Sequence, residues 1–141
     1  NRDYRWANEL TVKTAFLTLL YNDILYIMDS ETEIDKRFTD LTMIIRPDMR
    51  RFEISDILVE FKFVTLTDVS LTGEQARGLS REELEKLPEM RAKMQEAQKR
   101  LKVYGDALEQ KYKNLRLKRF AVVSLGFERL WAKAVCKEEA L

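Results

Sequence analysis

The sequence predicts an α/β domain in which a mixed central β-sheet is flanked by helices. Three observations support this fold class: a helical stripe near the amino end, three short apolar segments separated by turns, and a long helix followed by two further strands. A three-strand meander followed by a helix and more strands implies parallel pairing where the chain crosses back to the sheet. The expected element order is therefore αβββαβ plus a final strand.

The amino-terminal half is expected to form one helix and three strands. Apolar residues recur at helical spacing between Tyr4 and Leu20, namely Val12, Phe16, Leu19 and Leu20, with Glu9 at the head of the stripe. Runs rich in β-branched and aromatic residues, bounded by turn chemistry, predict strands at Ile24–Met28, Phe38–Arg46 and Phe52–Val64.

The carboxyl-terminal half is expected to hold a long helix and two strands. Two capping boxes, Thr72–Gln75 and Ser80–Glu83, predict short helices inside an insertion that spans Thr65–Leu87. Pro88 suits the first turn of the long helix, whose apolar face is Met90, Met94, Ala97, Leu101, Tyr104 and Leu108. Gly105 costs this helix about 1 kcal/mol against alanine, which indicates close packing or a local break there. The last strands are predicted at Phe120–Leu125 and Arg129–Val135.

Composition indicates one domain over residues 1–141. A chain of 141 residues with 45% hydrophobic and 35% charged content can bury roughly two-thirds of its unfolded surface in one core. No apolar run reaches the roughly 18 residues of a membrane span, and a lone cysteine, Cys136, fits a reducing compartment. We therefore expect a cytoplasmic domain without a membrane partner, cut from a longer polypeptide because the chain opens on Asn1.

Residue types restrict the chemistry that is available. The sequence contains no histidine, which removes imidazole-based triads and histidine-containing zinc sites. Its four glycines are scattered, so no phosphate-binding loop or dinucleotide fingerprint is present. If the domain does chemistry, the groups that remain are carboxylates, lysines, tyrosines and hydroxyls, which a divalent metal could assemble.

One strand carries charged residues in apolar surroundings. Side chains alternate along a strand, so Glu60 and Lys62 project together from the run Ile57–Val64, and Asp40 on the preceding strand can lie beside Glu60. Two converging carboxylates repel each other unless a cation such as magnesium, or manganese in its place, lies between them. The main-chain oxygen of Phe61 is a further candidate ligand, and Lys62 could orient the water that the metal activates.

These residues resemble the PD-(D/E)XK nuclease superfamily, and specifically the nuclease-like domain that follows an AAA-ATPase-like domain in many bacterial and archaeal proteins. The resemblance covers nearly the whole chain and is carried by Asn8-Glu9, Thr39–Phe52, Asp56–Val64, Gln98 and Tyr104. It implies a restriction-endonuclease-like core and magnesium-dependent hydrolysis of DNA. It also implies that Asp40 and Glu60 bind the metal, that Lys62 is the catalytic lysine, that Glu9 is an accessory acid, and that Gln98 contacts the metal shell or substrate.

Several alternatives stay open. Many relatives carry a glycine-arginine pair before the aspartate, whereas Arg37-Phe38-Thr39 precedes Asp40 here, and the motif proline is absent. A Glu-x-Lys pair on a strand is more often a surface salt bridge, and Tyr104 is equally well a core aromatic. The basic stretch from Arg91 to Arg119 is either a solvated helix face or a phosphate track. The competing functions are a non-cleaving nucleic-acid-binding or regulatory module of an ATPase-containing protein, and a purely structural domain.

Overall fold

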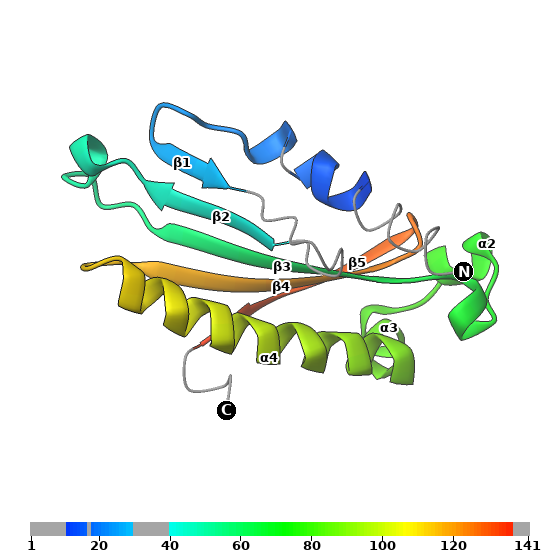
Figure 1. The fold of residues 1–141 in the computed structure, drawn as a ribbon. Coiled ribbons are helices and arrows are strands. Elements are labelled where there is room, and N and C mark those ends of the chain that lie inside the picture. The colour runs from blue at the N-terminus through cyan, green and yellow to red at the C-terminus, as the bar shows by residue number, and fades with distance from the viewer. Residues whose placement is uncertain (1–10, 17, 30–39, 137–141) are drawn as a thin grey trace.

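A five-stranded mixed sheet with helices on both faces forms the domain (Figure 1). The computed structural model describes residues 11–16, 18–29 and 40–136, except for the side chains of Asp29 and Asp40. The strands are β1 (Tyr26–Asp29), β2 (Asp40–Ile45), β3 (Asp56–Val64), β4 (Leu117–Leu125) and β5 (Arg129–Val135). The helices are a segment at residues 11–16 and 18–20, η1 (Pro47–Met49), η2 (Thr67–Val69), α2 (Gly73–Arg77), α3 (Arg81–Lys86) and α4 (Pro88–Lys111).

The strands lie in the sheet in the order in which they occur along the chain. β1, β2 and β3 form an antiparallel meander, β3 and β4 pair in parallel, and β5 returns antiparallel to β4. The crossover from β3 to β4 contains α2, α3 and α4, as a parallel connection requires. The α/β class, the mixed sheet and the parallel crossover predicted from the sequence are therefore confirmed.

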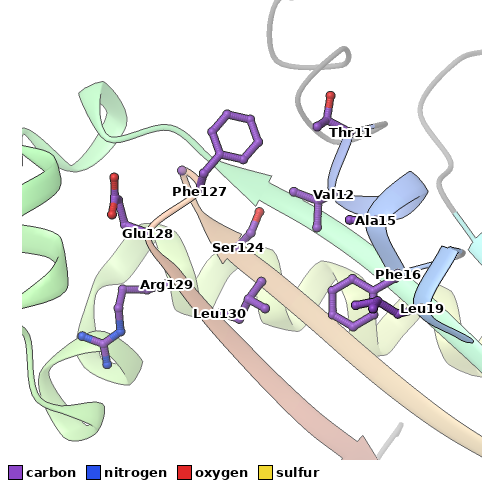
Figure 2. A pocket seen from close by; sticks show the side chains of 11 residues that line it. Thr11, Val12, Ala15, Phe16, Leu19, Ser124, Phe127, Glu128, Arg129 and Leu130 are labelled. Carbon is purple, nitrogen blue, oxygen red and sulfur yellow. The ribbon is translucent and has the colours of Figure 1, made fainter.

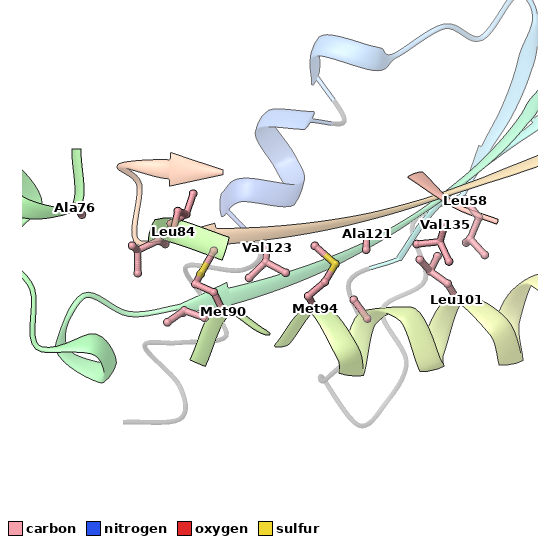
Figure 3. Close-up of a cluster of buried hydrophobic side chains, with 12 residues drawn as sticks. Leu58, Ala76, Leu84, Met90, Met94, Leu101, Ala121, Val123 and Val135 are labelled. Atoms are coloured by element: carbon pink, nitrogen blue, oxygen red, sulfur yellow. The ribbon is translucent and has the colours of Figure 1, made fainter. Parts of the chain in front are cut away.

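The two faces of the sheet are covered by different helices. α4 runs along one face beneath β3 and β4, and the helical segment at residues 11–16 and 18–20 lies on the opposite face (Figure 1). The core on the α4 side gathers apolar side chains from both layers (Figure 3), among them Leu58, Met90, Met94, Leu101 and Val123. The core on the other side is smaller and consists of Leu41, Met43, Val59, Phe61 and Val122, with Val12 and Phe16 packed against it.

Both predicted capping boxes are present. The Thr72 hydroxyl accepts from the Gln75 amide while the Gln75 side chain accepts from the Thr72 amide, and Ser80 and Glu83 make the same reciprocal pair. Each pair satisfies two amides that have no partner within the helix, which explains why helices of five and six residues form here. Among the described helices, none is long and apolar enough to cross a membrane.

The structure corrects the predicted starts of three strands. β1 begins at Tyr26 rather than Ile24, and β3 begins at Asp56 rather than Phe52, because a turn from Met49 to Phe52 takes up that stretch. β4 begins three residues early, at Leu117, where it pairs with Asp56. Leu19 continues the apolar stripe of the first helix but is 82% exposed, because the side chains of the sheet contact this helix at Val12 and Phe16.

Candidate active site

The strand register brings Asp40 opposite Glu60. The two residues are Cα partners in the antiparallel ladder between β2 and β3. Directly opposed residues of such a ladder project from the same face of the sheet. The predicted pairing of these two positions is therefore confirmed for the backbone, while the side chain of Asp40 lies outside the described part of the structure.

Glu60 is a buried carboxylate. The residue is 0% exposed and lies on the face of β3 that packs toward α4, since its neighbours Leu58 and Val64 belong to that core. Neither of its carboxylate oxygens accepts a hydrogen bond from any described residue. Burial of an ionised carboxylate costs several kcal/mol unless the site supplies charge and donors in return.

Lys62 brings a positive charge close to Glu60. Its Nζ atom lies 3.6 Å from Glu60 Oε1, and its side chain is only 11% exposed. Such a distance gives electrostatic attraction but is too long for a good hydrogen bond. Glu60 therefore keeps acceptor capacity for a further cation or donor, which is the property expected of a metal ligand.

Asp56 shows how a structural carboxylate on the same strand is satisfied. It lies four residues before Glu60 on the same face and is 0% exposed. It accepts from the Ile45 amide at 2.8 Å and from the Arg116 amide at 3.0 Å, and Arg50 donates to both oxygens at 3.0 and 3.2 Å. Burial raises the pKa of the Asp56 carboxyl, but these hydrogen bonds and the Arg50 charge outweigh burial and hold the pKa below its usual value.

The structural role of Asp56 was not predicted from the sequence. The sequence signal for its burial is the alternation of side chains along β3. The even-numbered residues share one face of the sheet, and they are Asp56, Leu58, Glu60, Lys62 and Val64. Its partners could not be found in the same way, because Arg50 and Arg116 come from two loops 66 residues apart along the chain. The contrast with Asp56 makes the unsatisfied oxygens of Glu60 informative.

Arg119 does not belong to a phosphate track. Its side chain is 3% exposed, and it donates to Asp106 and Glu109 at 3.2 Å each and to the Leu101 carbonyl at 3.4 Å. The guanidinium lies against Gly105, where an added Cβ would come within 2.3 Å of Arg119 Cζ. Close packing, rather than a helix break, is the reason for this glycine.

The other predicted site residues are placed as follows. Gln98 is half-buried on α4 and makes no hydrogen bond to the Glu60 carboxylate. The Phe61 side chain belongs to the opposite face, where its ring contacts Phe16 edge-on at 5.1 Å, so only its main-chain oxygen remains a candidate ligand. Tyr104 packs against the core and its hydroxyl accepts from Arg100, which supports the core interpretation. Glu9 lies outside the described residues.

One described residue, Glu60, has the chemistry of a ligand for a divalent metal. Glu60 offers buried carboxylate oxygens without hydrogen bonds, and hard cations such as Mg²⁺ prefer oxygen ligands. Among the residues whose side chains are described, no group of three or more acidic, cysteine or histidine residues could hold a metal. The second predicted carboxylate, that of Asp40, is outside this set, so Glu60 is the described metal-ligand candidate.

A pocket on the opposite face of the sheet has a different character. This hollow of about 490 Å³ lies between the helical segment at residues 11–16 and 18–20 and the β4–β5 turn (Figure 2). Its walls are mainly apolar side chains, including Val12, Phe16 and Leu130. Its one carboxylate, Glu128, is already bound to Arg77 at 2.8 Å. The described lining of the pocket therefore offers no cluster of carboxylates of the kind that metal-dependent hydrolysis requires.

The comparisons with known proteins add no family assignment. The sequence matches no protein-family model, and no curated protein or solved structure matches the chain at a significant level. The functional inference consequently rests on the residues and geometry of β2 and β3.

Proposed function

We propose that this chain is a metal-dependent nuclease domain that hydrolyses DNA phosphodiester bonds. The observation that carries the proposal is Glu60, a fully buried carboxylate with unsatisfied oxygens that lies opposite Asp40 and beside Lys62. A purely structural carboxylate would be expected to be satisfied as Asp56 is. The cost of burying Glu60 is understandable if the site binds a cation and substrate.

In this proposal each residue has a defined role. Asp40 and Glu60 would hold a magnesium or manganese ion together with the Phe61 main-chain oxygen. When bound, such an ion lowers the pKa of coordinated water and neutralises charge on a phosphate. Lys62 would hold the attacking water in line with the phosphorus and offset the negative charge that develops on the phosphate oxygens. Glu9 and Gln98 would be accessory groups.

The fold is compatible with this proposal. An αβββαβ order with a mixed sheet, and with the acidic residues on adjacent antiparallel strands, agrees with the restriction-endonuclease-like core implied by the resemblance. Fold class by itself does not determine activity. We also propose, from the resemblance alone, that the domain works within a polypeptide that carries an AAA-ATPase-like domain.

The test is cleavage of supercoiled plasmid and single-stranded DNA with magnesium or manganese. We expect Glu60→Gln and Lys62→Met to lose cleavage by at least about 100-fold, because each removes a group that acts on the reacting atoms. Glu82→Gln and Lys86→Met change exposed residues of the same types on α3 and should cleave like the wild type. Equal cleavage by all five proteins would attribute the activity to a contaminant and refute the proposal.

A non-cleaving nucleic-acid-binding module is the second candidate. The observation that favours it is the concentration of basic side chains in the loops at one end of the sheet, described below. Absence of metal-dependent cleavage by the wild type, combined with salt-sensitive DNA binding that survives Lys62→Met, would support this candidate over the nuclease.

A further inference from the structure

Two loops at one end of the sheet gather positive charge. Residues 46–55 connect β2 to β3, residues 111–118 end α4 and begin β4, and the two loops lie at the same end of the domain (Figure 1). Together they contain seven lysines and arginines, Arg46, Arg50, Arg51, Lys111, Lys113, Arg116 and Lys118, against two acids, Asp48 and Glu53. Asp56, the first residue of β3, holds its buried carboxylate against Arg50 at 3.0 Å, so seven positive charges face three negative ones; the net charge of +4 here leaves −3 for the rest of a chain of net charge +1. We call these two segments the basic end surface.

The loops of the basic end surface are tied together. Arg116 donates from its guanidinium to the carbonyls of Phe52 at 2.8 Å and Arg50 at 3.2 Å. Buried Asp56 accepts from the Arg50 guanidinium and the Arg116 amide, and its own amide donates to the Arg116 carbonyl. Because these bonds hold the loops in one arrangement, a ligand would meet a preorganised surface and pay less ordering entropy on binding.

Each loop also exposes one aromatic ring next to a cation. Phe52 is 44% exposed with Arg51 Cζ at 5.0 Å from its ring centroid, and Tyr112 is 37% exposed with Lys111 Nζ at 5.3 Å. Exposed rings beside basic groups are the combination with which proteins bind single-stranded nucleic acid: the rings stack on bases and the cations contact phosphates. Neither feature alone would point to this ligand.

We propose that the basic end surface binds single-stranded nucleic acid. Such a strand supplies both a regular row of negative charges and unstacked flat bases, whereas an acidic peptide or a lipid surface supplies charge without bases and a duplex keeps its bases stacked. The loops of this surface hold Asp56, which precedes Glu60 by four residues, or about 13 Å along β3, and we infer that a bound strand is directed toward the candidate active site. That orientation toward Glu60 rests on the proposed nuclease function, but the binding itself does not.

The test is fluorescence anisotropy of a labelled 20-nucleotide oligothymidylate, measured in EDTA at several salt concentrations. We expect Lys111→Glu/Lys113→Glu to weaken binding at least about tenfold and to lower the salt slope by about one unit or more. Phe52→Ala/Tyr112→Ala should weaken binding about tenfold with little change in that slope. The matched controls, Lys86→Glu/Arg91→Glu for charge and Phe127→Ala for an exposed ring, change exposed residues of α3, the start of α4 and the β4–β5 turn, which lie at the other ends of α4 and β4 from the two loops, and should bind like the wild type.

Three results would overturn the proposal. The first is an equal loss of affinity in the control variants. The second is a duplex of equal length bound as tightly as the single strand, with no effect of the aromatic substitutions. The third is binding to phosphatidylserine vesicles without binding to the oligonucleotide. Circular dichroism and melting curves establish that each variant is folded. If Lys111→Glu/Lys113→Glu does not fold, the charge-neutralising variant Lys111→Gln/Lys113→Gln takes its place.

This proposal and the nuclease proposal can fail separately. Glu60→Gln should keep full oligonucleotide affinity in EDTA, because Glu60 lies outside the basic end surface. Binding without any cleavage by the wild type would refute the nuclease alone. Cleavage that depends on Glu60 but is unaffected by the loop substitutions, with unchanged affinity, would refute the basic end surface alone.

Discussion

Gly105 of α4 lies directly against the guanidinium of Arg119 on β4. A Cβ at Gly105 would stand 2.3 Å from Arg119 Cζ and 2.4 Å from its Nε. The arginine is only 3% exposed and is held by Asp106 and Glu109 at 3.2 Å. The glycine thus allows the helix to approach a buried cation that joins α4 to the sheet.

Gly105→Ala should therefore destabilise the domain, although alanine is the better helix former by about 1 kcal/mol. The methyl group would push the guanidinium away from its partners. We expect the free energy of unfolding, measured with urea, to fall by about 1–3 kcal/mol. Gly78→Ala is the control, because its nearest neighbours are backbone oxygens 3.6 Å away and its φ of −81° suits alanine. In an Arg119→Leu background the cost of Gly105→Ala should disappear; a cost of equal size there would show that Arg119 is not the cause.

The ion pair between Asp56 and Arg50 makes a second prediction. Since Asp56 is fully buried and accepts four hydrogen bonds, Asp56→Asn should lower the free energy of unfolding at pH 7 by about 3 kcal/mol. The folded pKa lies below the usual value of about 3.9, so this carboxylate stabilises the fold above that pH. The stabilisation is lost as the pH falls through the lowered folded pKa.

Urea unfolding from pH 7 down to pH 2 measures this linkage. The difference between the wild type and Asp56→Asn should narrow as the pH drops below about 4. Asp48→Asn removes an exposed aspartate of the neighbouring loop and should change stability by less than about 0.5 kcal/mol. A difference between wild type and Asp56→Asn that stays constant over the whole range would mean that the charge of Asp56 is not what stabilises the fold.

Removal of both charges from the candidate site should not unfold the domain. The double variant Glu60→Gln/Lys62→Met takes away a buried pair whose attraction acts over 3.6 Å, and replacement of such pairs is often neutral or stabilising by about 1–4 kcal/mol. We expect a melting temperature equal to or above that of the wild type, together with loss of cleavage. A fall of more than about 3 kcal/mol in the free energy of unfolding would indicate a structural role for the pair.

Asp40→Ala is expected to abolish metal binding without unfolding the domain. It should also raise the melting temperature slightly, because it removes the repulsion between the carboxylates of Asp40 and Glu60. Calorimetric titration with Mn²⁺ and thermal melting without metal measure the two effects. Asp48→Ala, on the loop after the same strand, is the control and should bind metal normally. A melting temperature lowered by about 10 °C, roughly 3 kcal/mol for a domain of this size, would identify Asp40 as structural.

Local patterns determined several parts of the fold. The capping boxes at Thr72 and Ser80, the start of α4 at Pro88 and its buried stripe follow from neighbours within four residues, and all are present in the structure. Alternation along β3 likewise placed Glu60 and Lys62 on one face. Interactions of this range are encoded directly in residue order. The register that sets Asp40 opposite Glu60 was only one possibility in the sequence, and the ladder between β2 and β3 decided it.

Only the tertiary structure decided which charged residues are buried and satisfied. Arg119 was one basic residue among many in the sequence, and Asp56 one acidic residue before a strand, yet both are buried and held by groups from other segments. Leu19 continued an apolar stripe but faces solvent. The physical reason is that burial and hydrogen bonding depend on elements far apart along the chain. For the same reason, the unsatisfied oxygens of Glu60 became visible only after the sheet and α4 had come together.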